Sequence, residues 1–186
     1  MYMSKKVLIL GGDAVEALEI FYPYYRCLEE GFDTTIASPS VKKLYTVTHD
    51  FIDGMETYVE KPAYGLDSHI AFKDVNPADY DALIIPGGRA PEYIRLDESL
   101  PAIVRHFFEE NKPVAVVCHA AQVLSVIPDL MKGREYTAYI ACKPDVTATG
   151  ATYIEKDLHT EGNLVSGHAW PDLPGLMKEF MKMVNK

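Results

Sequence analysis

Short runs rich in apolar residues alternate with segments of helical periodicity along this chain. Four runs, at residues 7–10, 32–37, 81–85 and 113–117, each predict a buried β-strand. Strands that are apolar on both faces are typical of a parallel sheet that helices cover on both sides. The pattern therefore predicts an α/β fold, a flavodoxin-like doubly wound sandwich with a mostly parallel central sheet.

The segments between the strands predict helices and one hairpin. A helix is expected over about residues 14–30, and its predicted buried face is Ala14, Leu18, Phe21, Tyr22 and Tyr25. Residues 100–108 and 173–184 repeat apolar positions at helical spacing and predict two further amphipathic helices. A short helix over 120–127 is expected to stop at Pro128. The less regular stretch 45–70 predicts a hairpin, with turns at 53–54 and 64–65.

Composition narrows the class of protein. The chain has 186 residues, 18 Lys+Arg against 27 Asp+Glu and a net charge of −9, which speaks against nucleic acid or an anionic membrane as partner. Three cysteines without C-x-x-C spacing favour reduced thiols, and the amino terminus has no long apolar segment. We therefore expect one domain over residues 1–186 in the cytoplasm. No histidine spacing or glycine motif predicts a metal site or a cofactor.

The strongest chemical signal is Cys118, which directly follows the strand predicted at 113–117 and precedes a helix. A strand-to-helix turn of this kind is a nucleophile elbow, and the positive end of the following helix would favour the thiolate. Ala120 supplies the small residue that lets the backbone pass close by. A buried, inert cysteine at the end of a core strand has the same local pattern. His119 is adjacent, yet consecutive residues entering a helix point about 100° apart, so the local sequence leaves a structural role equally open.

Two further segments follow strands at the same edge of the sheet. Glu16 comes just after the first strand and would face the elbow, where burial would raise its pKa and suit it to moving a proton. A surface carboxylate at a helix start is the simpler alternative, and Glu19 would be its neighbour or solvated. Gly87 and Gly88 follow the strand at 81–85, and their N–H groups could bind a developing oxyanion.

Four separated segments together resemble the ThiJ/PfpI superfamily, the group that includes the parkinsonism-associated deglycase and the PfpI intracellular peptidases. They are VLILGGDAVEALEIFYPYYRCLEEG, DYDALIIPGGRAPEYIRL, KPVAVVCHAAQVL and GNLVSGHAWPDLP, and they span nearly the whole chain. The resemblance implies a class I glutamine amidotransferase-like form of the predicted fold. Two positions depart from the family pattern, because Ala120 replaces the glycine of C-H-G and Ala17 replaces an acidic residue after Glu16.

The resemblance also implies roles for individual residues. Cys118 would be the nucleophile, and Glu16 would hydrogen-bond its sulfur and act as acid or base. Gly88 and the backbone of His119 match the oxyanion-binding positions, with Gly87 and Ala120 beside them. Glu92 matches a glutamate that reaches across a subunit interface to the histidine at His119, which implies a homo-oligomer, a dimer or a hexamer.

Three functions remain open at this point. The first is glutathione-independent conversion of small α-oxoaldehydes, methylglyoxal to lactate, with the deglycase activity related to it by carbonyl chemistry. The second is an intracellular cysteine peptidase or amidase that uses Cys118, His119 and Glu92 on a peptide. The third is a redox-sensing stress protein without catalytic activity, in which Cys118 is oxidised.

Overall fold

The computed structural model describes residues 4–186. Its strands are β1 (Lys6–Leu10), β2 (Asp33–Ser38), β3 (Lys43–Asp50), β4 (Val59–Asp67), β5 (Ile70–Ala71), β6 (Ala82–Ile85), β7 (Val114–Val117), β8 (Glu135–Tyr136), β9 (Thr152–Tyr153), β10 (Leu158–Glu161) and β11 (Leu164–Gly167). Its α-helices are α1 (Ala17–Glu29), α2 (Ala90–Ile94), α3 (Leu100–Glu109), α4 (Ala121–Leu124), α5 (Pro128–Met131), α6 (Lys143–Ala148) and α7 (Leu173–Val184). Short 3₁₀ turns are η1 (Phe72–Asp74), η2 (Pro77–Asp79), η3 (Cys118–Ala120), η4 (Ile140–Cys142) and η5 (Trp170–Asp172).

The central sheet confirms the predicted fold class. Its strand order is β10-β11-β7-β6-β1-β2-β5, and every neighbouring pair is parallel except β10 with β11. The inner part of this order, β2-β1-β6-β7-β11, is the flavodoxin-like one. The carboxyl ends of β1, β6 and β7 therefore meet at one edge of the sheet, where the predicted site residues follow each strand.

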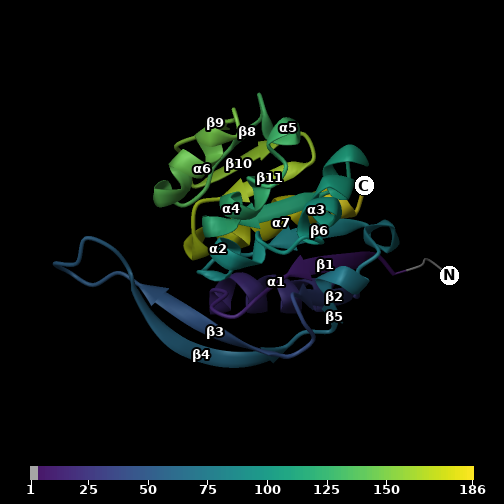
Figure 1. Ribbon diagram of the computed structural model, residues 1–186, viewed down its shortest axis with the longest axis horizontal. Coiled ribbons are helices and arrows are strands. Elements are labelled where there is room, and N and C mark those ends of the chain that lie inside the picture. The colour runs from purple at the N-terminus through teal and green to yellow at the C-terminus, as the bar shows by residue number, and fades with distance from the viewer. Residues whose placement is uncertain (1–3) are drawn as a thin grey trace.

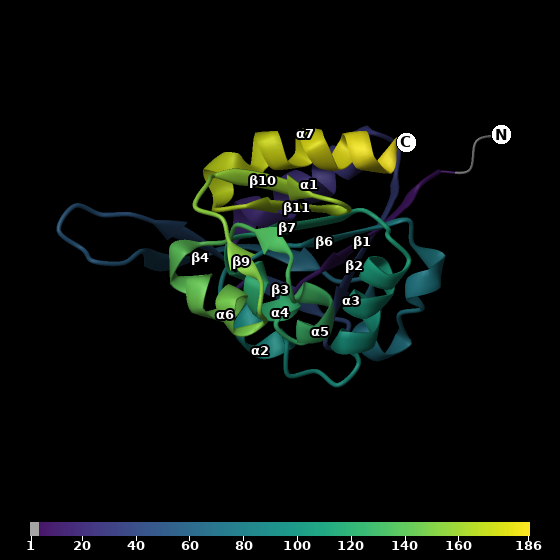
Figure 2. The ribbon, with the colours of Figure 1, turned by 90° about the horizontal axis from the view of Figure 1, so that it is seen from above.

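Helices cover both faces of this sheet, with α1 and α7 on one side and α3, α4 and α5 on the other (Figure 2). Alternate residues of β1 enter the two layers. Leu8 and Leu10 pack with the α3 side chains, whereas Val7 and Ile9 pack with α1 and α7. Strands buried on both faces need apolar residues at every position, which explains the unbroken apolar runs in the sequence.

The predicted buried face of the first helix is wrong. Leu18 and Tyr25 are 52% and 58% exposed, and the buried positions of α1 are Ala17, Glu19, Ile20, Pro23 and Cys27. Because α1 carries apolar residues on all sides, helical periodicity alone is compatible with two different buried faces. The helix face that contains Glu19 is the one that packs against the sheet.

The hairpin predicted over 45–70 is present as β3 and β4, and its tip extends beyond the body of the molecule (Figure 1). The turn predicted at 53–54 lies in this tip, whereas Tyr64 and Gly65 lie inside β4. The base of the hairpin is joined to the loop after β1, since the Val47 N–H donates to the Val15 carbonyl at 2.9 Å. Within residues 4–186, none of the helices is long and apolar enough to cross a membrane.

Candidate active site

Cys118 occupies a strained turn at the end of β7. Its φ is +59°, in the left-handed region that residues with a side chain rarely adopt, and η3 begins with it. This backbone is that of a nucleophile elbow. The side chain is nevertheless only 2% exposed, and Ala120 is fully buried beneath the turn. The elbow thus presents the sulfur to a closed site rather than to open solvent.

Gly87 and Gly88 let three backbone segments meet at the sulfur. Gly88 has φ +72°, and a Cβ there would lie 2.3 Å from the Glu16 backbone nitrogen. A Cβ on Gly87 would lie 2.6 Å from Glu19 Oε2 and 2.7 Å from Cys118 Cβ. The Gly88 and His119 backbone N–H groups hydrogen-bond the Cys118 sulfur and favour its thiolate. Both predicted oxyanion positions therefore face the sulfur, and their role toward a substrate stays a prediction.

The carboxyl group beside the Cys118 sulfur belongs to Glu19, so the contact predicted for Glu16 is wrong. Glu19 is fully buried, and its Oε2 accepts from the Gly87 N–H at 2.7 Å. Its Oε1 has no partner of ordinary hydrogen-bond geometry among residues 4–186. Burial and the neighbouring charge of Glu16 raise the pKa of Glu19 to about 8, against hydrogen bonds from Gly87 and Cys118. At neutral pH Glu19 is therefore mostly a neutral acid that can carry its proton on Oε1.

Glu16 instead caps helix α1. Its Oε2 accepts from the Glu19 N–H at 2.8 Å, and further N–H groups of Leu18 and His49 hydrogen-bond its carboxylate. Burial raises the pKa of Glu16, and these three N–H groups oppose the rise. A carboxylate in the residue before the first helical position is normally occupied in this way. Applied to the sequence, this capping rule assigns the Glu16 side chain to the helix cap and leaves Glu19 as the carboxyl group available to the site.

His119 lies directly against the sulfur, with its Nδ1 at 3.1 Å from Cys118 Sγ. Burial and, to a smaller extent, the charge of His49 lower the pKa of His119 to about 4, so the imidazole is neutral at physiological pH. Burial also raises the pKa of the Cys118 thiol, and the charge of Glu19 raises it further. Burial therefore opposes the thiolate that the helix end would favour, and the short turn is followed by a helix of only four residues.

Glu92 stands apart from this cluster within one chain. It lies on α2, where its side chain is exposed, and no hydrogen bond joins it to His119 among the described residues. Contact with a second subunit stays a prediction. The structure thus brings together Cys118, His119, Gly87 and Gly88, replaces Glu16 by Glu19, and leaves Glu92 at the surface.

Aromatic rings surround His119 on the solvent side, and the sequence analysis did not single them out. The Tyr139 and Tyr58 ring centroids lie 5.1 Å and 5.9 Å from that of His119. Tyr58 is the residue before β4, and Tyr139 is the residue before η4. Isolated tyrosines in irregular segments carry no periodic signal, so only the tertiary structure reveals this cover.

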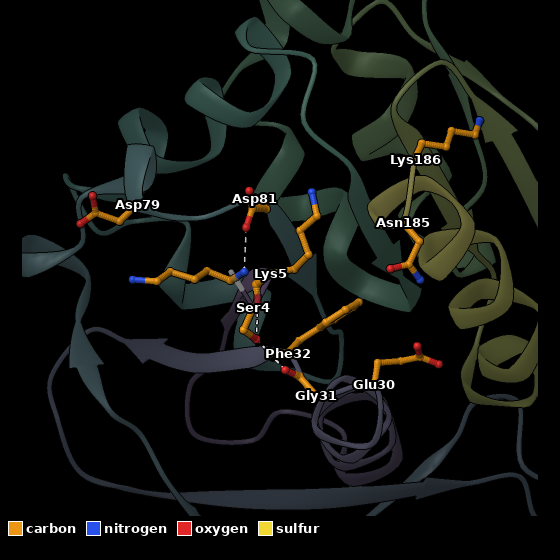
Figure 3. Close-up of a pocket in the computed structure, with 10 residues that line it drawn as sticks. Ser4, Lys5, Glu30, Gly31, Phe32, Asp79, Asp81, Asn185 and Lys186 are labelled. Carbon is orange, nitrogen blue, oxygen red and sulfur yellow. Dashed lines mark hydrogen bonds between the residues drawn. The ribbon is translucent and has the colours of Figure 1, made fainter. Parts of the chain in front are cut away.

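Among residues 4–186, Cys118 is the only cysteine with a positive φ. In residues 4–186 no group of three His, Cys, Asp or Glu side chains could hold a metal ion. An open pocket of about 960 Å³ lies at the opposite, amino-terminal end of the strands, bounded by Lys5, Phe32 and Asp81 (Figure 3). It contains none of the residues around Cys118.

An α/β sandwich with a cysteine elbow, an adjacent histidine and a buried acid defines a class of cysteine-dependent proteins. The chain belongs to the DJ-1/PfpI family, whose model matches residues 5–183. This finding confirms the resemblance seen in the sequence.

Individual relatives agree with this assignment. The chain is 38% identical to Deglycase PfpI of Pyrococcus furiosus, covering 96% of this chain and 99% of that protein. It is 39% identical to Protein DJ-1 homolog D of Arabidopsis thaliana, covering 97% of this chain and 48% of that protein. A two-domain protein of Anabaena variabilis with DJ-1/ThiJ/PfpI-like and ferritin-like domains matches with a TM-score of 0.85 and 27% identity, over 98% of this chain and 48% of its own. The chain thus spans about half the length of the plant and cyanobacterial proteins.

Proposed function

We propose that this chain is a cysteine-dependent enzyme that converts small α-oxoaldehydes without glutathione, with methylglyoxal giving lactate. The observation that carries the proposal is the meeting of Cys118 and Glu19 at Gly87, in a site where the pKa of Glu19 is raised to about 8. An acid–base group works best when its pKa lies near the operating pH. The name deglycase of the Pyrococcus relative supports carbonyl chemistry at this site.

The first step is addition of the thiol to the aldehyde carbon. His119 Nδ1, at 3.1 Å from the sulfur, accepts the thiol proton as the S–C bond forms. The electron pair of the C=O bond moves to oxygen, which the N–H groups of Gly88 and His119 stabilise. The proton then passes to that oxygen, and the product is a neutral hemithioacetal.

Glu19 carries the next proton transfer. In its ionised form it takes the hydrogen from the former aldehyde carbon as a proton, which leaves an enediolate, and it then gives that proton to the neighbouring carbon. The hydroxyl proton on the first carbon passes to the oxygen of the second, so that the first carbon becomes the thioester carbonyl. The result is a lactoyl thioester on Cys118. Water hydrolyses this thioester to lactate and restores the thiol, so no external oxidant or reductant enters the cycle.

The decisive experiment measures lactate formed from methylglyoxal, without glutathione, by the wild type and three variants. We expect no turnover in Cys118→Ala and a loss of about 100-fold or more in Glu19→Gln. Glu16→Gln is the matched control one helical turn away, and we expect it to keep most of its activity because glutamine can still accept the capping N–H. Wild-type protein that forms no lactate would refute the proposal, and cleavage of a peptide amide lost in Cys118→Ala would favour the peptidase.

A further inference from the structure

The Cys118 sulfur is covered by side chains of a segment outside the chemistry proposed above. Cys118 and His119 are 2% and 6% exposed, although both lie at the carboxyl edge of the sheet, where a substrate must arrive. The Tyr58 ring stands edge-on to His119, at 83°, and 5.8 Å from the Tyr139 ring. Burial and the charge of nearby Cys118 together raise the pKa of Tyr58 to about 12, and the ring contacts place Tyr58 beside His119, the neighbour of the sulfur.

A hydrogen-bonded network that runs from the buried His49 to the surface holds Tyr58 in this place. The His49 ring packs on that of Tyr58 with centroids 4.3 Å apart, and its side chain is 1% exposed. His49 Nε2 donates to Glu60 Oε2 at 3.1 Å, because the carboxylate can only accept. Arg89 binds the same carboxylate through two nitrogens, with Nη2 at 2.8 Å and Nε at 3.1 Å, and lowers the pKa of Glu60.

The network joins the hairpin to the helix that follows Gly88. Arg89 is the residue before α2, whereas His49 and Glu60 face each other across β3 and β4. His49 fills an inward position that the strand pattern reserves for an apolar residue, between the buried Val47 and the hairpin tip. A buried polar side chain in such a place costs stability unless it is fully paired, so its arrangement is specific.

We propose that Tyr58 is a specificity-determining residue of the Cys118 site and that His49 is the residue that positions it. The Tyr58 ring limits the group that a carbonyl compound carries next to its reacting carbon, so that small dicarbonyls reach the sulfur and bulky ones do not. This inference rests on the proposed function for its substrate class, but the cover over the sulfur can be tested without turnover.

The test measures alkylation of Cys118 by two reagents with the same reactive head, iodoacetamide and an iodoacetamide that carries a naphthyl group. In both, sulfur bonds to the methylene carbon and iodide leaves. The readout is the rate of Cys118 alkylation by the naphthyl reagent divided by the rate of alkylation by iodoacetamide. A general loosening of the fold raises both alkylation rates, so it changes this ratio little. Cys118→Ala reports labelling of the buried Cys27 and Cys142.

We expect Tyr58→Ala to raise this ratio by about tenfold, the size of effect that pocket walls have on discrimination. Tyr64→Ala is the matched control, because Tyr64 lies on β4, the strand that directly follows Tyr58, but is 78% exposed, and its ratio should equal that of the wild type. His49→Ala should raise the ratio by about threefold, and His49→Phe, which restores a ring against Tyr58, should return it to the wild-type value. A Tyr58→Ala ratio equal to that of the wild type would overturn the proposal. Equal ratios in His49→Ala and the wild type would remove the positioning role.

Turnover provides the second readout. In Tyr58→Ala, kcat/KM for phenylglyoxal relative to methylglyoxal should rise by about tenfold, and an unchanged preference would contradict the assigned specificity. If neither compound is turned over by any variant, the proposed function fails. The alkylation ratio alone then decides whether Tyr58 limits access to the Cys118 sulfur.

Discussion

Glu19→Gln should make the protein more stable at alkaline pH, although it removes the central acid of the site. The folded protein holds the proton of Glu19 up to a pKa of about 8, whereas the unfolded chain releases it near 4.5. Between these values the folded state binds one more proton than the unfolded state. The free energy of unfolding therefore falls as pH rises through this window, and the loss is complete above about pH 8.

The size of the effect follows from the two pKa values. Each pH unit between 4.5 and about 8 contributes about 1.4 kcal/mol, so ionising Glu19 costs the folded state up to about 5 kcal/mol. Glutamine mimics the neutral acid: its oxygen can accept from the Gly87 N–H, and its amide can face the sulfur. The variant should thus match the wild type near pH 4.5 and exceed it by about 3–5 kcal/mol at pH 8.5.

Urea unfolding of both proteins at pH 5, 6.5 and 8.5 measures this difference. Glu29→Gln on the same helix is the control, since Glu29 forms only an exposed ion pair with Arg26 and its removal should change stability by less than about 1 kcal/mol. Parallel curves for Glu19→Gln and the wild type across this range would refute a raised pKa at Glu19, and with it the assignment of the neutral acid.

Three further outcomes follow from the same geometry. With methylglyoxal, kcat/KM should rise about tenfold per pH unit and level off near pH 8, as the Glu19 carboxylate forms; a rate that is flat between pH 6 and 8 would exclude Glu19 as the base. Gly88→Ala should destabilise the fold by about 3 kcal/mol or more in urea unfolding, because its Cβ would meet the Glu16 nitrogen, whereas Gly31→Ala, with φ +77° and open space around it, should cost only about 1 kcal/mol. If Glu92 serves the site of a second subunit, mixing inactive Cys118→Ala with impaired Glu92→Ala protein should restore activity above that of either alone; no gain in the mixture would remove Glu92 from the site.

The fold was predictable because its signals are long and redundant. The two central strands β6 and β7 are buried on both faces and have no polar residue, as residues 82–85 and 114–117 show. The last helix buries Leu176, Met177 and Phe180 at the positions that periodicity predicts. The elbow at Cys118 was also visible, since it lies where an apolar strand ends.

The two errors in the first helix have one cause. Sequence reasoning treats a glutamate as a surface residue. It therefore predicts that the helix face with Leu18 and Tyr25 is buried, rather than the face that contains Glu19. In the structure Glu19 and Ile20 are fully buried, and burial keeps the carboxyl protonated at neutral pH. A neutral acid packs as an ordinary polar side chain, and hydrophobic periodicity has no means of showing this.

The same balance between burial and charge bears on the redox-sensing function considered for Cys118. A redox-sensing cysteine needs a thiolate that oxidants can reach, because both oxidation and exchange proceed through the ionised sulfur. Here the side chain is 2% exposed, and burial raises the pKa of the thiol despite the N–H groups of Gly88 and His119. The four-residue helix α4 is too short to supply a strong dipole. We therefore expect this sulfur to resist oxidation in the resting protein, and slow oxidation of Cys118 by hydrogen peroxide, measured beside an exposed thiol, would check this; oxidation as fast as that of the exposed thiol would contradict it.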